Sequence, residues 1–267
     1  MLNNIIKIIM VILIICVCYI GYILYQNQIK NIKIYDELNL PIVKKSDNIQ
    51  IPKIIIQTWK TNDIPTKYLD LVNSIKTHNP DYKYMFFSDI DIENFLKHNY
   101  PKYYETYLKL PIIIQKIDFF RYVAIYHYGG FYMDLDIECS KSFNPLLKYS
   151  CIFPIDDVIT NKMCGLTRYK NFCKNKQKFL LGQYAFASVP KHPFIKNLIE
   201  TINLNVDNYI KYLLPNNNDY VYKTTGPDFV TNLYVDYQDK TDILILNNNK
   251  RQYFGDFAQH KYFGSWK

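Results

Sequence analysis

The segment from Asp118 to Asp136, DFFRYVAIYHYGGFYMDLD, constrains the fold of this chain more than any other part of the sequence. Its first part is typical of a helix that Gly129-Gly130 would end through a left-handed cap. A short apolar strand, Phe131 to Leu135, would then deliver Asp134 and Asp136. Because side chains alternate along a strand, the two carboxylates would point to the same side at its end. Such acids repel each other unless a cation lies between them, so the pattern predicts a cation site.

The predicted helix adds a charged pair to this site. Asp118 and Arg121 are three residues apart and therefore share one helix face. On its own, the pair would be a surface ion pair worth less than about 1 kcal/mol. The acidic strand that follows favours a functional role, since ligands of open α/β sheets bind beyond the carboxyl ends of strands. Carboxylate ligands with open positions suit Mn²⁺ or Mg²⁺, which would also bind a diphosphate.

The rest of the chain predicts alternating strands and helices, which imply an α/β sandwich with a largely parallel sheet. The predicted strands are residues 51–58, 82–87, 131–135, 183–189 and 242–246. The predicted helices are residues 65–77, 88–96, 115–128, 193–214 and 228–237.

An apolar run precedes this domain. Ile8 to Tyr25 contains eighteen residues without a charge, nearly enough to cross a bilayer core. It lacks the small-residue cleavage site of a signal peptide, so we predict an uncleaved signal anchor in a Golgi, ER-type or other internal membrane. The predicted organisation is an anchor (1–26), a stem (27–50) and a catalytic domain (51–267). Basic residues flank the run on both sides, which leaves the membrane side of the domain open.

Charge and cysteine content narrow the possible partners. The formal net charge is +8, but no block of like charges or basic–aromatic cluster points to nucleic acid. The excess charge suits either a solvated surface or anionic partners such as membranes and nucleoside diphosphates. The four cysteines after the anchor lack metal-finger spacing, and one disulfide among them is possible without being required.

Together these motifs resemble glycosyltransferase family 32, the enzymes with a DXD sugar-binding region related to yeast initiation α-1,6-mannosyltransferase and inositol phosphoceramide mannosyltransferases. The resemblance runs from about Ile51 to Lys267 and is densest from Gln115 to Leu147. The motif spacing is also similar to that of the glucosylating domain of large clostridial toxins. The resemblance implies a GT-A-like nucleotide-sugar-binding fold with a mixed, mostly parallel sheet.

The resemblance also implies roles for the acidic segment. Asp118 and Arg121 match the pair that grips the donor sugar, and Tyr132 matches a tyrosine that contacts the donor. Asp134 is expected to touch ribose or sugar hydroxyls and to reach the metal through water. Asp136 is expected to ligate the metal directly.

Further implied roles lie outside this segment. Trp59 matches the aromatic residue that stacks on the nucleotide base, with a buried core tryptophan as the alternative. His260 resembles a further metal ligand, with an exposed surface histidine as the alternative. Ser265 and Trp266 would close over the diphosphate, and Thr225-Gly226-Pro227 resembles a segment near the acceptor side.

Two positions depart from the family pattern. Ile56 stands where the opening strand usually carries His, so a polar group near the base is missing. Gln183 stands where the family tends to have Asn, which affects any acceptor or leaving-group role there.

These observations predict a metal-dependent retaining glycosyltransferase. It would move a hexose from a nucleoside diphosphate sugar to a hydroxyl of a sphingolipid-like or glycan acceptor. GDP-mannose is the favoured donor, with UDP sugars as rivals. The alternative is a catalytically inactive nucleotide-sugar or glycan-binding module on the same fold, which the departures at Ile56 and Gln183 would explain.

Overall fold

The computed structural model describes residues 2–36, 38, 40–46, 49–211, 218–248 and 250–264. The chain forms two compact units, Met1–Asn39 and Leu40–Lys267. The first is the helix α1 (Leu2–Asp36), which contains the candidate membrane span Ile9–Gln26. By length and composition this span can cross a membrane, and the helix continues into the predicted stem.

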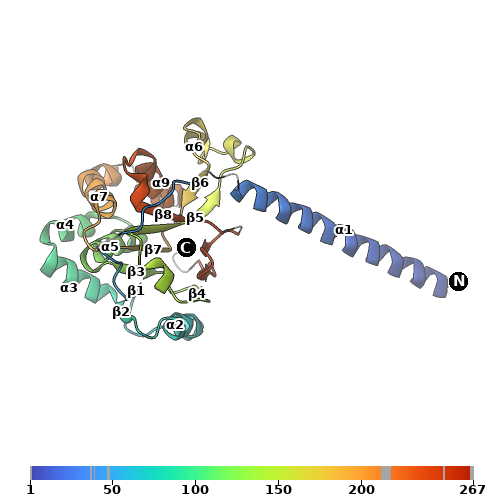
Figure 1. The fold of residues 1–267 in the computed structure, drawn as a ribbon, viewed down its shortest axis with the longest axis horizontal. Helices are drawn as coiled ribbons and strands as arrows, with labels where there is room; N and C mark the ends of the chain where they lie inside the picture. The colour runs from blue at the N-terminus through green and yellow to red at the C-terminus, as the bar shows by residue number, and fades with distance from the viewer. Residues whose placement is uncertain are drawn as a thin grey trace. The chain divides into compact units, whose positions relative to one another are not determined.

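The second unit is built on a seven-stranded sheet (Figure 1). The strand order is β2-β1-β3-β7-β5-β6, and β8 also pairs with β5. The strands are β1 (Ile54–Thr58), β2 (Lys83–Phe87), β3 (Gly130–Met133), β5 (Cys151–Val158), β6 (Phe179–Leu181), β7 (Ala185–Ser188) and β8 (Ile243–Leu246).

The sheet is mixed. β1 runs parallel to β2 and β3, and β5 runs parallel to β8, whereas β7 is antiparallel to both β3 and β5. β6 is also antiparallel to β5. Five strands therefore run in one direction and only β6 and β7 run in the other, which confirms the predicted mixed, mostly parallel α/β class.

Helices cover the sheet. α5 packs against β1, β3 and β7 and also contacts α4 and α7, whereas α2 packs against the short strand β4 (Ile137–Cys139), which lies outside this sheet. The helices of this unit are α2 (Thr66–His78), α3 (Asp89–Asn99), α4 (Pro101–Lys109), α5 (Ile113–Tyr128), α6 (Lys170–Lys174), α7 (Pro193–Lys211), α8 (Asn218–Thr224) and α9 (Pro227–Asp236). Short 3₁₀ turns are η1 (Asn144–Leu146), η2 (Met163–Gly165) and η3 (Lys240–Asp242).

The strand β3 is buried on both faces. Phe131 and Met133 join one core cluster, whereas the Tyr132 ring faces Phe186 at 5.8 Å. The turn from α5 into β3 needs glycine, because Gly130 has φ +90° and a Cβ there would lie 2.5 Å from the carbonyl oxygen of Ile54. The glycine pair thus lets β3 pass close beside β1.

The predicted strand at residues 131–135 is wrong at its end. β3 stops at Met133, and Asp134 to Asp136 lie in a turn before β4 (Ile137–Cys139). The Asp134 N–H donates to the Tyr184 carbonyl, and the Ile137 N–H donates back to the Asp134 carbonyl. The two carboxylates therefore converge through a turn and not through strand alternation.

A small second sheet brings the end of the chain to this turn. Its order is β4-β10-β9, with β9 at Tyr253–Phe254 and β10 at Ala258–His260. In this antiparallel pairing His260 lies opposite Ile137. A residue far along the sequence is thereby placed next to Asp136.

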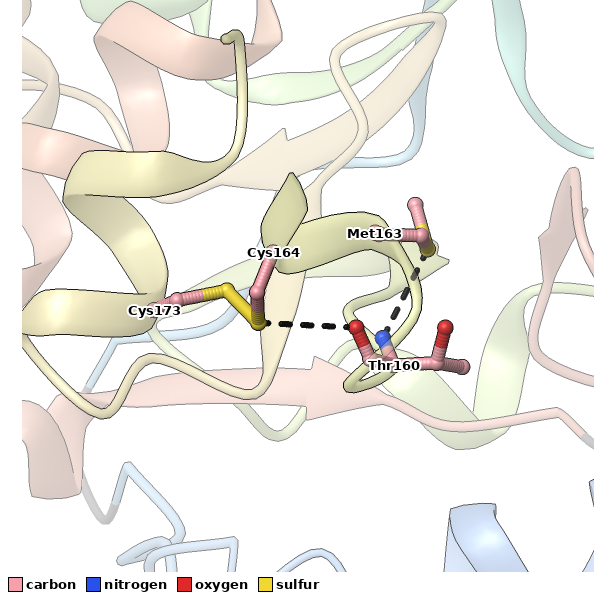
Figure 2. The surroundings of a disulfide bond; sticks show 4 residues. All are labelled: Thr160, Met163, Cys164 and Cys173. Atoms are coloured by element: carbon pink, nitrogen blue, oxygen red, sulfur yellow. Dashed lines mark hydrogen bonds between the residues drawn. A yellow bond between two sulfur atoms is a disulfide. The ribbon is translucent and has the colours of Figure 1, made fainter. Parts of the chain in front are cut away.

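The connection between β5 and β6 is closed by a disulfide between Cys164 and Cys173, as Figure 2 shows. The sulfur of Cys164 also lies 3.6 Å from the Thr160 carbonyl oxygen. The disulfide that the sequence allowed without requiring is therefore present. It encloses the loop that carries Arg168.

Breaking this disulfide is expected to lower the free energy of unfolding by roughly 2–3 kcal/mol, because it constrains a loop of about ten residues in the unfolded chain. Thermal unfolding with and without dithiothreitol measures the effect. The double variant Cys164→Ser/Cys173→Ser should unfold at the temperature of the reduced protein and should not respond to the reductant. A wild-type melting temperature that dithiothreitol leaves unchanged would contradict this expectation.

Candidate active site

A pocket of about 410 Å³ lies at the carboxyl ends of β1 and β3. Trp59 follows β1, and Asp134 and Asp136 follow β3, while Asp156 comes from β5 and His260 from β10. This is the edge where ligands of open α/β sheets bind.

Arg121 is the buried centre of the site, with only 3% of its surface exposed. Its Nη2 lies 3.1 Å from Asp118 Oδ1 and 3.4 Å from Asp134 Oδ1. Its Nη1 donates to the Gln183 carbonyl at 2.9 Å, and its guanidinium lies 4.5 Å from the centre of the Tyr132 ring. The pair Asp118–Arg121 is therefore part of a buried ionic network and not a surface ion pair.

The carboxylate of Asp118 is held from a second side. The Thr225 hydroxyl donates to Asp118 Oδ2 at 2.8 Å, and the Tyr122 hydroxyl donates to the Thr225 carbonyl at 2.7 Å. The same hydroxyl also contacts the side chain of Gln183. Burial raises the pKa of Asp118 to about 6, although Arg121 opposes the shift.

Asp134 is oriented by β1 and β3. The Tyr132 hydroxyl donates to Asp134 Oδ1 at 3.0 Å and lies 3.3 Å from the Thr58 hydroxyl. The buried amide of Gln57 donates to the Asp134 carbonyl at 3.1 Å and accepts from the Tyr84 hydroxyl. Burial raises the pKa of Asp134 against the opposing charge of Arg121. The sequence did not predict this supporting role of Gln57.

Asp136 pairs with the C-terminal segment. Its Oδ1 lies 3.1 Å from His260 Nε2, and its Oδ2 accepts from the Phe263 N–H at 2.9 Å. The His260 ring stacks on Tyr184 at 4.7 Å. Burial alone would raise the pKa of Asp136, but the hydrogen bond with His260 and the charge of His260 lower it overall. The pKa of His260 is raised, because Asp136 outweighs the opposing effect of burial.

Asp134, Asp136 and His260 fit a divalent cation. One ligand atom from each residue lies within 4.8 Å of the other two. Two carboxylates and an imidazole form a donor set that suits Mn²⁺. The Nδ1 atom of His260 is buried and has no hydrogen-bond partner among the described residues. The predicted ligands are thus brought together, and the choice between Mn²⁺ and Mg²⁺ stays a prediction.

The other residues singled out from the sequence have three different outcomes. Trp59 lines the pocket, but it is also half-buried and packs edge-on against Tyr68 of a core cluster at 5.2 Å, so its stacking role stays a prediction. Ile56 is fully buried within β1 and does not line the pocket. Ser265 and Trp266 lie outside the described residues, and their predicted roles stay predictions.

Sequence reasoning missed five charged residues that also line the pocket: Lys60, Asp89, Asp156, Arg168 and Arg251. One signal was available in the sequence. Only three of the 32 basic Lys and Arg residues are arginines, and all three line this pocket. In a chain that otherwise uses lysine, arginine marks places where a planar, multiply donating cation is needed.

The fold and the site together define a class. Acids, an imidazole and a buried arginine meet at the carboxyl edge of a mixed α/β sheet, which is the arrangement of a protein that binds an anionic ligand together with a cation. Residues 65–153 match the family model described as "Glycosyltransferase sugar-binding region containing DXD motif". The chain therefore carries the sugar-binding region of the DXD glycosyltransferases, and the predicted resemblance is confirmed.

Two yeast relatives agree with this assignment. The chain is 33% identical to inositol phosphoceramide mannosyltransferase 1 of Schizosaccharomyces pombe over 193 residues, covering 70% of this chain and 52% of that protein. It is 30% identical to mannosyl phosphorylinositol ceramide synthase CSH1 of Saccharomyces cerevisiae over 189 residues, covering 70% and 43%. The chain thus spans about half the length of these relatives. A solved structure, the PaToxG glycosyltransferase, is similar with a TM-score of 0.48 and 19% identity, covering 79% of each chain.

Two carboxyl groups of the pocket are expected to titrate near pH 6. Burial raises the pKa of Asp118 to about 6, and burial together with neighbouring Asp157 does the same for Asp156. Because both values lie above those of an unfolded chain, folding takes up protons between about pH 4 and pH 6. The contribution of these two groups to stability is therefore most favourable below this range and falls as the pH rises through 6.

Carbon-13 NMR of labelled aspartates measures these titrations directly. One titration near pH 6 should vanish in Asp118→Asn and the other in Asp156→Asn. If every aspartate carboxyl titrated near pH 4, the described burial of these groups would be wrong.

Proposed function

We propose that this chain is a metal-dependent, retaining mannosyltransferase that transfers mannose from a nucleoside diphosphate sugar to a lipid-linked hydroxyl. The observation that carries the proposal is the meeting of Asp134, Asp136 and His260 beside buried Arg121. Asp134, Asp136 and Arg121 lie inside the matched sugar-binding region, and β10 brings His260 to them from outside it. The relatives named as inositol phosphoceramide mannosyltransferases support mannose as the sugar and a sphingolipid as the acceptor. GDP is the favoured nucleotide.

Different residues of the pocket would have different roles in the reaction. A cation held by Asp134, Asp136 and His260 would supply positive charge to the diphosphate. Arg121 carries a permanent charge that would offset the charge developing on the leaving group. Asp118 and Asp134 have their carboxylates held by Thr225 and Tyr132, so they can orient sugar hydroxyls without reorganising.

Same-face attack accounts for retention without a protein nucleophile. The acceptor oxygen would bond to the anomeric carbon as the bond from that carbon to the phosphate oxygen breaks. The proton of the acceptor hydroxyl would pass to the leaving phosphate oxygen. Trp59, which directly follows β1 and lines the pocket, would stack on the nucleotide base.

We also propose that α1 anchors the enzyme in an internal membrane with the catalytic domain on the oxidising side. The candidate span Ile9–Gln26 and the Cys164–Cys173 disulfide support this arrangement, because disulfides persist in oxidising compartments. The limits of the anchor, stem and catalytic domain remain those proposed from the sequence.

A nucleotide-sugar screen tests the proposed function. The full chain, purified in detergent with Mn²⁺, is expected to release GDP from GDP-mannose faster than it releases UDP from UDP sugars. Asp136→Ala should lower this rate by about 100-fold or more, because a direct metal ligand is lost. Glu138→Gln is the matched control, since this exposed carboxylate lies two residues away and outside the pocket.

Two outcomes would contradict the proposal. Near-wild-type release by Asp136→Ala would end the site assignment. Metal-dependent binding of a nucleotide sugar without any diphosphate release would favour the binding-module alternative.

A further inference from the structure

The strand order separates the pocket into two sides. Trp59 follows β1, which lies on one side of β3, while Asp156 belongs to β5, which lies beyond β7 on the other side. With strands about 4.8 Å apart, β5 lies roughly 10 Å from β3. The residues assigned to the donor occupy the β1 and β3 side. Residues on the β5 side also line the pocket, and none of the roles proposed for binding the donor involves them.

Asp156 is aimed into this side by a β-bulge. Ile155 pairs with Leu181 and Asp157 pairs with Leu180, so Asp156 is an extra residue without a partner on β6. Bulges of this kind redirect side chains and are frequent beside active sites. Among the described residues, none donates a hydrogen bond to the Asp156 carboxylate or lies within salt-bridge distance of it, although the charges of Arg251 and Arg168 act on it. A half-buried carboxylate without a donor is suited to accept a hydrogen bond from a ligand hydroxyl.

Arg168 lies on the same side and is held in place. Its Nε donates to both carboxylate oxygens of Asp228 at 3.0 Å, and its Nη2 lies 2.5 Å from Asp228 Oδ1. Asp228 is fully buried in the first turn of α9, whereas the Arg168 side chain keeps 20% exposure. The guanidinium also lies 4.3 Å from the centre of the Tyr222 ring. The Cys164–Cys173 disulfide closes the loop that carries Arg168.

Arg251 completes the group. Its Nη2 lies 3.1 Å from Asp157 Oδ2, and its side chain is 62% exposed. Among the described residues this is the only ion pair that Arg251 makes. Because a guanidinium has five N–H donors, both Arg168 and Arg251 keep donors beyond those used by their aspartates.

These donors and acceptors match one kind of ligand. Two arginines with spare N–H groups suit a phosphate, which arginine binds through paired hydrogen bonds. The carboxylate of Asp156 in the same pocket, which accepts no hydrogen bond from the described residues, suits a hydroxyl. We propose that Asp156, Arg168 and Arg251 form the acceptor subsite and bind a phosphorylated polyol headgroup, with Asp156 accepting from a ring hydroxyl and the arginines facing the phosphate. This inference rests on the proposed function and adds the residues that select the acceptor.

Acceptor kinetics with three soluble probes test the subsite in the full chain. The probes are glycerophosphoinositol, myo-inositol without a phosphate, and glycerol phosphate without a ring. Asp156→Asn is expected to raise the KM for both inositol compounds about tenfold or more, since a charge-assisted hydrogen bond is lost. Arg251→Gln should raise the KM for glycerophosphoinositol by about tenfold and leave that for myo-inositol unchanged. The KM for the donor should stay the same in both variants.

The control is Asp70→Asn, which removes an exposed carboxylate on α2 outside the pocket and should change neither KM. An unchanged acceptor KM in Asp156→Asn would overturn the inference, as would a raised donor KM, which would place Asp156 on the donor side. If the chain used glycerol phosphate as an acceptor as efficiently as glycerophosphoinositol, the proposed recognition of the polyol ring would be wrong.

A binding measurement separates this inference from the proposed function. If the wild-type chain released no diphosphate from any donor, the proposed function would fail. Calorimetric titration with glycerophosphoinositol would still decide the subsite. Binding by wild type that weakens about tenfold in Arg251→Gln supports it, and no binding by wild type overturns it.

Discussion

The site depends on one buried cation, Arg121, shared between a helix and the sheet. A guanidinium with 3% exposure is stable in the interior only when acids and carbonyl groups pair with it. Asp118 supplies one partner from α5, and Asp134 supplies the other from the turn after β3. The Gln183 carbonyl supplies a third contact. This network holds α5, the turn after β3 and the segment before β7 in one arrangement, and that arrangement creates the pocket.

The cation site and the proposed acceptor subsite are built on this arrangement by parts of the chain that lie far away in the sequence. β10 places His260 opposite Ile137 and so beside Asp136. The bulge in β5 turns Asp156 toward the same pocket. In the proposed arrangement, the nucleotide extends toward β1 and the acceptor toward β5. One sheet edge can thereby hold both substrates with the anomeric carbon between them.

Much of the donor site could be predicted from sequence because it is local. Asp118, Arg121, Asp134 and Asp136 lie within nineteen residues, and helix periodicity and the glycine pair are enough to bring them together. The sequence predicted that Asp134 and Asp136 converge by alternation along a strand, and this was wrong. The last residues of that predicted strand form a turn, in which the Asp134 N–H donates to the Tyr184 carbonyl. His260 was reached only through the family resemblance. Asp156, Arg168 and Arg251 were missed, because a bulge and long-range ion pairs leave no periodic signal.

The central claim is that Asp134, Asp136 and His260 hold a divalent cation beside Arg121. Electron spin echo envelope modulation of Mn²⁺ bound to the purified full chain tests it most directly, because the method detects nitrogen ligands of the ion. We expect coupling to an imidazole nitrogen that disappears in His260→Gln, together with weaker Mn²⁺ binding in Asp136→Asn. A bound Mn²⁺ without nitrogen coupling, or with coupling that survives in His260→Gln, would contradict it.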